Sequence, residues 1–169
     1  MQVCVYWMEK MEQSSKSSNL YRRGDMSKIV NNEETLQKAI EAATIARSNS
    51  YSPFSGFAVG AAVVCADGSI FAGTNIENPS YGATICAERS AIAAMVSSKG
   101  WQEIDAVCLV TQASPPAVPC ALCLQVLAEF CTAETLIHSV ALHTGEQKRY
   151  TFSELLPHPF SFSQTNQTK

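Results

Sequence analysis

Charged residues are scarce in this sequence. Asp, Glu, Lys and Arg make up 16% of its 169 residues, whereas about 25% is usual for soluble domains. We infer that part of the surface is covered by something other than water, such as another subunit. The 46% hydrophobic share is near the globular norm and excludes a disordered or fibrous protein. The length predicts one domain with a core of its own.

The sequence also lacks an excess of positive charge. Twelve Lys and Arg residues stand against fifteen Asp and Glu residues, which gives a formal net charge of -3. A dedicated nucleic-acid-binding domain usually carries a basic patch, and here only Arg22-Arg23 and Lys148-Arg149 place two basic residues side by side. We therefore do not predict a nucleic-acid partner.

Long apolar runs and a clear targeting segment are missing as well. The longest apolar stretch, residues 57–66, is about half of the ~20 residues that a membrane span needs. Residues 1–8 are apolar but have neither a basic region nor a small-residue cleavage site. Seven cysteines, an odd number, fit free thiols and metal ligands in a reducing compartment better than a disulfide scaffold. We therefore predict a soluble cytoplasmic protein without a membrane partner.

The composition divides the chain into three parts. Residues 1–30 include a Gln-, Ser- and Lys-rich stretch without apolar periodicity, which predicts a disordered extension. Two interpretations of this part are possible: it is a functional arm, or the start of the protein is wrongly assigned and Met26 is the true first residue. Residues 31–160 form the predicted domain, and the polar residues 161–169 are predicted to be a flexible tail.

Helical and strand patterns alternate within residues 31–160. Asn31 and Glu34 resemble a capping box that opens a helix, and this helix ends before Tyr51. Asp67-Gly68 is a strong hairpin signal. The predicted strands are 58–66, 69–75, 104–111, 136–142 and 148–152. The further predicted helices are 86–98, 120–131 and, capped by Thr151 with Glu154, the short turn 153–156. This order predicts an α/β fold in which helices pack on a mixed sheet.

Three cysteines stand at the starts of predicted helices. They are Cys86 and the pair Cys120 and Cys123, whose spacing places both on one helical face. The amino-terminal end of a helix lowers the pKa of a thiol, so all three are predicted to be thiolates. Thiolates favour zinc, and three protein ligands with one open position are typical of catalytic zinc. A structural zinc knuckle is the alternative, but it supplies no fourth ligand.

Glu88 adds chemistry to this metal site. It follows Cys86 by two residues, close enough to reach water on the metal without binding the metal itself. A glutamate at this spacing, together with a Pro-Cys-x-x-Cys motif, is the signature of the zinc deaminases, in which it acts as a general acid and base. Pro119 and the two cysteines that follow complete that motif here. The pattern predicts hydrolytic deamination.

Over residues 31–160 the chain resembles the small homotetrameric, zinc-dependent cytidine deaminases, which act on free nucleosides in pyrimidine salvage. The matching stretches follow one another in the order seen in that family. They are Tyr51-Ser52-Pro53-Phe54, Phe57-Ala58-Val59-Gly60-Ala61-Ala62, Asn75-Ile76-Glu77-Asn78, Tyr81, Cys86-Ala87-Glu88-Arg89, Pro119-Cys120, Cys123, Gln125, Leu155-Leu156-Pro157 and Phe160. The resemblance implies a three-layer α-β-α fold with a mixed five-stranded sheet, and deamination of cytidine and deoxycytidine to uridine and deoxyuridine.

The same resemblance implies roles for the other site residues. Asn75 and Glu77, two apart on an extended segment, would hold the ribose hydroxyls. Phe57 would pack against the pyrimidine, and the backbone of Ala87 would help to fix the base. The remaining three are Tyr81, in a loop between adjacent sites, Phe160, which would close the pocket of a neighbouring subunit, and Arg89, which would hydrogen-bond to the thiolates.

Two positions depart from the family pattern, and the one that matters for the metal is Leu124. The family usually reads Cys-Gly-x-Cys-Arg-Gln at the second cysteine pair, and this chain has Ala121 and Leu124 where the glycine and arginine would stand. The second arginine that would offset the charge of three thiolates is therefore missing. Three alternatives remain beside an active cytidine deaminase: a weakly active or non-catalytic paralogue, an aminonucleoside-antibiotic deaminase and a polynucleotide deaminase. The Asn75 and Glu77 pair disfavours the second, and the missing basic groove disfavours the third.

Overall fold

The computed structural model describes residues 33–161. The predictions for residues 1–30, for the tail beyond residue 161 and for Asn31 as a helix cap lie outside this range. The described helices are α3 (Glu33–Ser48), the short 3-10 helix η2 (Tyr81–Ala83), α4 (Ala87–Lys99), α5 (Ala121–Leu127) and α6 (Phe152–Leu155). The strands are β1 (Gly60–Cys65), β2 (Ile70–Thr74), β3 (Ile104–Thr111), β4 (Cys131–Ala141) and β5 (Gln147–Thr151).

The five strands form one mixed sheet in the order β2-β1-β3-β4-β5. Strands β3 and β4 are parallel, and every other neighbouring pair is antiparallel. A parallel pair needs a crossover connection, and here α5 lies in that connection. The hairpin predicted at Asp67-Gly68 joins β1 and β2, and Gly68 has the positive φ of 83° that such a turn favours. The predicted mixed five-stranded sheet is confirmed.

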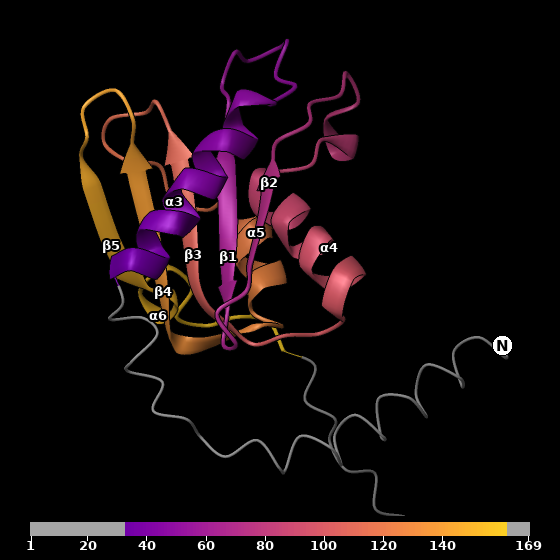
Figure 1. Ribbon diagram of the computed structural model, residues 1–169. Coiled ribbons are helices and arrows are strands. Elements are labelled where there is room, and N and C mark those ends of the chain that lie inside the picture. The colour runs from indigo at the N-terminus through magenta and orange to yellow at the C-terminus, as the bar shows by residue number, and fades with distance from the viewer. Residues whose placement is uncertain (1–32, 162–169) are drawn as a thin grey trace, which may run out of the picture.

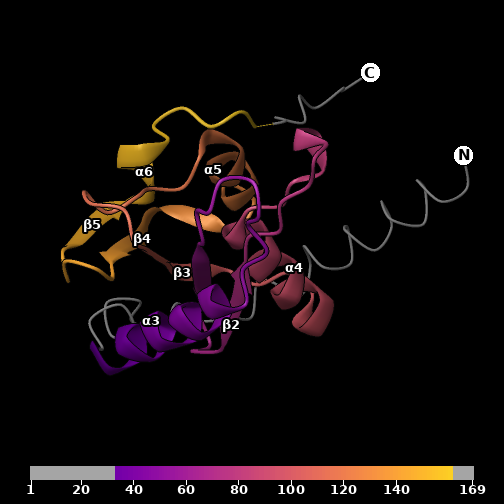
Figure 2. The same cartoon turned by 90° about the horizontal axis from the view of Figure 1, so that it is seen from above.

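Helices cover both faces of the sheet, which gives the predicted three layers. Figures 1 and 2 show α3 on one face and α4, α5 and α6 on the other. Each face of the sheet has its own apolar core, and successive residues of β1 point to opposite faces. Val63 packs with Met95 of α4 on one face, and Val64 packs with Leu36 of α3 on the other. Burial on both faces explains why β1 and β3 are apolar almost throughout.

The third helix is shorter than the sequence pattern predicts. We expected a helix over residues 120–131, but α5 ends at Leu127 and β4 already begins at Cys131. The Phe130 amide donates to the Leu127 carbonyl (2.9 Å), and the Phe130 carbonyl accepts from the Ile104 amide (2.9 Å). Pairing with β3 therefore outweighs the helical periodicity, and β4 starts five residues before the predicted strand.

Close packing of α4 on β2 sets the position of the candidate site. A Cβ atom at Gly73 would lie 2.3 Å from the Ala91 amide nitrogen, so only glycine permits this approach. At the other end of the sheet, Thr151 and Glu154 form the predicted capping box that opens α6. Among residues 33–161, no helix combines the length and apolar character needed to cross a membrane.

Candidate metal centre and active site

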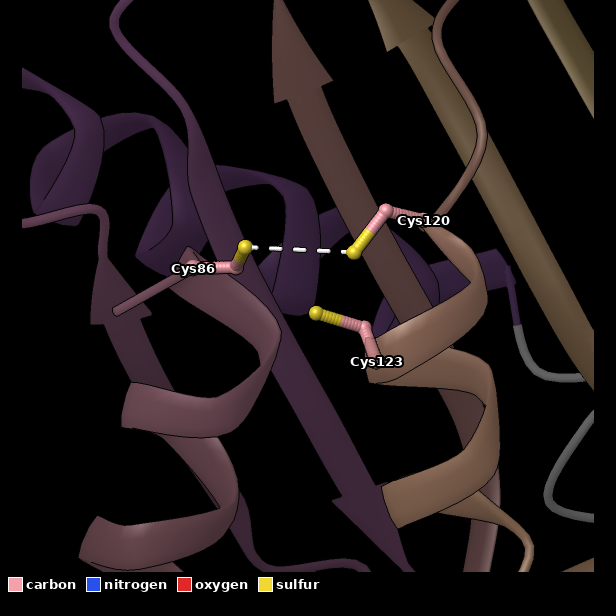
Figure 3. Close-up of side chains that lie close together, drawn as sticks. All are labelled: Cys86, Cys120 and Cys123. Atoms are coloured by element: carbon pink, nitrogen blue, oxygen red, sulfur yellow. Dashed lines mark hydrogen bonds between the residues drawn. The ribbon is translucent and has the colours of Figure 1, made fainter. Parts of the chain in front are cut away.

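Three cysteines meet between the first turns of α4 and α5. Cys86 is the N-cap residue of α4, Cys120 is that of α5, and Cys123 lies in the first turn of α5. Their Sγ atoms all lie within 4.8 Å of one another, and those of Cys86 and Cys120 are 3.9 Å apart (Figure 3). A tetrahedral zinc ion with Zn–S bonds of ~2.3 Å would separate its sulfur ligands by about 3.8 Å. The donor set and its spacing therefore fit one metal ion with a fourth position left for another ligand.

The pKa direction agrees with the sequence prediction at Cys120 and differs from it at Cys86 and Cys123. We expected the helix ends to lower the pKa of all three. Instead, burial raises the pKa of Cys86 and of Cys123 above the ordinary thiol value. Burial acts on Cys120 too, but hydrogen bonds from the Cys123 amide and from neighbouring thiols lower its pKa overall. Desolvation therefore decides the pKa direction at Cys86 and Cys123, whereas hydrogen bonds decide it at the exposed Cys120.

Arg89 lies beside the sulfur cluster, as the family pattern implies. Its Nη2 atom donates to the Thr84 carbonyl (2.9 Å) and to Cys86 Sγ (3.7 Å). Its Nε atom is buried without a hydrogen-bond partner among the described residues. A guanidinium in this place contributes a positive charge that offsets part of the negative charge of a thiolate.

Glu88 lies in the first turn of α4 and is only 4% exposed. Burial, opposed by hydrogen bonds and by the charge of Arg89, raises the pKa of its carboxyl group above the usual range. A carboxyl group shifted in this direction binds and releases a proton closer to neutral pH, which suits a general acid and base.

Most of the predicted site residues line one pocket. Seven of them do so: Phe57, Asn75, Glu77, Cys86, Ala87, Glu88 and Cys120. Cys123 is fully buried beside them. Tyr81 and Phe160 do not line this pocket and are 87% and 73% exposed, respectively. Within the described part of the chain, their side chains therefore contribute nothing to the site of their own subunit.

Asn75 and Glu77 are bound to the loop that carries Phe57. Asn75 Oδ1 accepts from the Val59 amide (2.9 Å) and the Ser50 hydroxyl (2.6 Å), and its Nδ2 donates to the Phe57 carbonyl (2.8 Å). Glu77 accepts from the amide of Phe54 (2.8 Å), the amide of Ser55 (3.2 Å) and the Ser55 hydroxyl. Both side chains thus shape the pocket wall, which sequence reasoning missed because these partners lie 16 to 25 residues away.

Comparison with known proteins places this geometry in a family. The family described as "Cytidine and deoxycytidylate deaminase zinc-binding region" matches residues 32–139. The chain belongs to this family.

Named relatives agree over most of their length. The chain is 42% identical to the cytidine deaminase of Halalkalibacterium halodurans over 130 residues, which cover 77% of this chain and 97% of that protein. It is 40% identical to the cytidine deaminase of Sporosarcina psychrophila over 126 residues, which cover 75% of this chain and 91% of that protein.

Solved structures show the same fold. The cytidine deaminase of Burkholderia pseudomallei superposes with a TM-score of 0.68 at 36% identity, over 73% of this chain and 98% of that one. The enzyme of Mycobacterium tuberculosis gives a TM-score of 0.65 at 35% identity, over 75% and 98%. The family resemblance and the α-β-α fold predicted from the sequence are therefore confirmed.

Leu124, one of the two residues that depart from the family pattern, is part of the apolar core. It is 6% exposed and packs in the cluster that contains Met95, Leu127 and Phe152. Because Leu124 makes an apolar contact where the family has an arginine, Arg89 is the one arginine among the described residues that hydrogen-bonds to the cluster of Cys86, Cys120 and Cys123. An arginine at position 124 could either hydrogen-bond to the thiolates or disturb this packing, and the apolar environment favours the second outcome.

We therefore expect Leu124→Arg to destabilise the protein. Leaving a guanidinium buried without a partner costs about 3–5 kcal/mol, which thermal unfolding would reveal as a clearly lower Tm. Leu122→Arg is the matched control, because Leu122 is on the same helix but 57% exposed, and it should change stability by no more than ~0.5 kcal/mol. An unchanged Tm for Leu124→Arg with raised activity would show instead that the arginine reaches the thiolates.

Gln125 has a contact that its place in the sequence motif did not explain. Its Nε2 donates to the Phe160 carbonyl (2.8 Å), and its Oε1 accepts from the Phe160 amide (3.0 Å). One side chain thus satisfies both backbone groups of Phe160 and anchors the carboxyl-terminal segment to α5. The phenyl ring itself remains exposed. This role could not be predicted from the sequence, because the two residues are 35 positions apart in the chain.

Proposed function

We propose that the protein catalyses the hydrolytic deamination of cytidine and deoxycytidine to uridine, or deoxyuridine, and ammonia. The observation that carries this proposal is the buried Glu88 next to three convergent cysteine sulfurs in one pocket with Asn75 and Glu77. A binding module would not need a buried carboxyl group with a raised pKa at a metal centre.

Zinc is the metal that the donor set supports best. Thiolate ligands favour zinc over magnesium or calcium, and Cys86, Cys120 and Cys123 would hold one ion. A zinc ion bound there supplies a Lewis acid that lowers the pKa of water from 15.7 to about 7. Arg89 would keep the Cys86 thiolate in place through its hydrogen bond and its charge.

Glu88 moves the protons in the proposed reaction. Its carboxylate accepts a proton from the attacking water and delivers it to N3 of the cytosine ring, while the oxygen attacks C4. The carboxylate then takes the second proton, from the new hydroxyl group on C4, and passes it to the amino group, so that the C4–N bond breaks, C4=O forms and ammonia leaves. Burial of Glu88 keeps bulk water away from these transfers and raises the pKa of its carboxyl group above the usual range, the direction that suits a group which both accepts and donates a proton.

The hydrogen-bond inventory of Asn75 and Glu77 supports recognition of a sugar hydroxyl. A carboxylate offers about four acceptor sites and an amide nitrogen two donors. Three acceptor sites of Glu77 and one donor of Asn75 are occupied by residues 54–57. Among the contacts of the described residues, one acceptor of Glu77 and one donor of Asn75 remain, which is what a hydroxyl group requires. Phe57 and the backbone of Ala87 would contact the base.

Replacement of these two residues should penalise nucleosides while leaving the metal in place. We expect Asn75→Ala and Glu77→Ala each to lower kcat/KM for cytidine by about 5- to 150-fold, because a buried hydroxyl left without a partner costs ~1–3 kcal/mol. Metal content should stay at the wild-type level, since neither residue touches a cysteine sulfur in the described contacts. Equal kcat/KM in variant and wild type would refute the sugar role.

The function itself is tested by ultraviolet-monitored turnover of cytidine, deoxycytidine and cytosine, with zinc measured per chain on the same sample. We expect turnover of both nucleosides, in preference to the free base. A zinc-replete protein that turns over none of them would instead support the non-catalytic alternative. A kcat below that of relatives with an arginine at the position of Leu124, measured at full zinc occupancy, would fit an effect of the missing arginine on the metal site.

We further propose a homotetramer in which Tyr81 and Phe160 complete the pockets of neighbouring subunits. Both side chains are exposed and lie outside the pocket of their own chain, and Gln125 holds the backbone of Phe160 in place. Light scattering should give four chains per particle, and Phe160→Ala should reduce activity. A fully active monomer at assay concentration would contradict this, as would an unaffected Phe160→Ala variant.

The proposed setting is pyrimidine salvage in the cytoplasm. The cysteines of the described residues are free thiols, which fits a reducing compartment. The substrates of the proposed reaction are free nucleosides.

A further inference from the structure

The segment of residues 50–59, which we call the Phe57 loop, forms one wall of the pocket. Its first part pairs with the chain after β2, because the Tyr51 amide donates to the Asn75 carbonyl (3.2 Å) and the Glu77 amide donates to the Tyr51 carbonyl (2.8 Å). Its last part is held by the side chain of Asn75, as described above. The two ends of the loop are therefore anchored to the segment after β2 that carries Asn75 and Glu77.

The middle of the loop is held by the Glu77 carboxylate, by the Ser55 hydroxyl and by the Gly56 amide, which donates to the Ser52 carbonyl (3.0 Å). The Ser55 hydroxyl donates to Glu77 Oε1 and accepts from the Phe57 amide (2.9 Å). Between Ser55 and Phe57 the chain reverses at Gly56, whose φ of 67° favours glycine. One hydroxyl thus links the carboxylate proposed to bind the sugar to the backbone of the residue proposed to contact the base.

This link lies at an exposed part of the pocket, where a glutamate side chain would otherwise move freely. Ser55 is exposed and Glu77 is half-buried, and ordering such a carboxylate on substrate binding costs rotamer entropy. Hydrogen bonds from the Ser55 hydroxyl and the Phe54 amide also hold the pKa of Glu77 below its usual range, so it remains an acceptor. A carboxylate already fixed before binding avoids that entropic cost.

We propose that Ser55 is a positioning residue for nucleoside binding, which ties the Glu77 carboxylate to the Phe57 amide and so fixes the sugar-binding and base-binding groups relative to each other. This inference rests on the proposed function, since it assumes a nucleoside in the pocket. It adds a residue that contacts neither the metal ligands nor Glu88 in the described structure.

The test measures cytidine binding without turnover. In a zinc-loaded Glu88→Gln background, calorimetry should show that Ser55→Ala raises the Kd for cytidine roughly 3- to 10-fold, the usual worth of one such hydrogen bond. Ser55→Thr retains a hydroxyl and should restore the Kd to within about twofold. Ser52→Ala is the matched control: it lies in the same loop, and its described hydroxyl contact is with Ser50. It should leave the Kd unchanged.

A double-mutant cycle separates positioning from general loosening of the loop. If Ser55 acts through Glu77, Ser55→Ala should add no further loss of affinity once Glu77 is replaced by Ala, which removes both oxygens that could accept from the Ser55 hydroxyl. An equal loss with and without Glu77, or no loss at all, overturns the proposal. A second readout is amide hydrogen exchange of Phe57, which should accelerate in Ser55→Ala and not in Ser52→Ala; unchanged exchange also overturns it.

Failure of the proposed function would look different. In that case the wild-type protein turns over no nucleoside and the Glu88→Gln protein binds no cytidine. Amide exchange of Phe57 then decides on the Ser55 link by itself, because that hydrogen bond is present without a ligand. A Kd unchanged by Ser55→Ala in a protein that does turn over cytidine refutes the Ser55 proposal alone.

Discussion

Glu88→Gln is expected to fold and to bind zinc like the wild type but to lose nearly all turnover of cytidine. Glutamine keeps the shape of the side chain and part of its hydrogen bonding, yet it cannot accept the proton of the attacking water or pass it to the ring. Proton transfer by a positioned side chain is typically worth ~10²–10⁴-fold. Because one carboxyl group serves several transfers here, we expect a loss of kcat at the upper end of that range.

The measurement is kcat for cytidine together with the zinc content and Tm of the same sample. Glu134→Gln is a suitable control, because Glu134 is exposed on β4, away from the pocket, and it should retain wild-type kcat. A Glu88→Gln protein that kept more than about one hundredth of wild-type kcat would show that another group moves the proton. Loss of zinc in this variant would point to a direct metal-binding role instead.

Cys120→Ala is expected to reduce zinc from one ion per chain to a small fraction and to abolish activity. The thiol of Cys120 is one of only three described cysteine ligands, so its removal leaves a pair that cannot complete the site. Alanine also leaves the start of α5 intact, because the described contacts of Cys120 as N-cap include no side-chain capping bond. We therefore expect the substitution to reduce zinc binding and to leave the fold unchanged.

Metal analysis of dialysed protein measures this outcome. Cys131→Ala is the matched control, since Cys131 is a free cysteine at the start of β4 and lies outside the cluster; it should retain one zinc per chain. Zinc that is substoichiometric in the wild type and unchanged in Cys120→Ala would refute the assignment of these cysteines as ligands.

Local patterns in the sequence predicted much of the fold. The continuous apolar run of β1, the Asp67-Gly68 turn and the Thr151 with Glu154 capping box each depend on neighbours a few residues apart. The end of α5 did not follow from such a pattern, because backbone pairing between Phe130 and Ile104 decided where the helix stops. A helical pattern of apolar residues cannot predict backbone pairing between residues that are 26 positions apart.

The sequence by itself determined the candidate metal ligands and the candidate proton carrier. Cys86, Glu88, Cys120 and Cys123 are recognisable because short spacings place them at two helix starts, and the structure brings the three sulfur atoms together. Only the tertiary structure decided what surrounds them. Burial raises the pKa of Cys86, Cys123 and Glu88. Leu124 packs into the apolar core. The Ser55 link and the Gln125 anchor likewise join residues distant in the chain. Solvent exclusion and long-range hydrogen bonds arise only when the layers pack, so no local spacing can encode them.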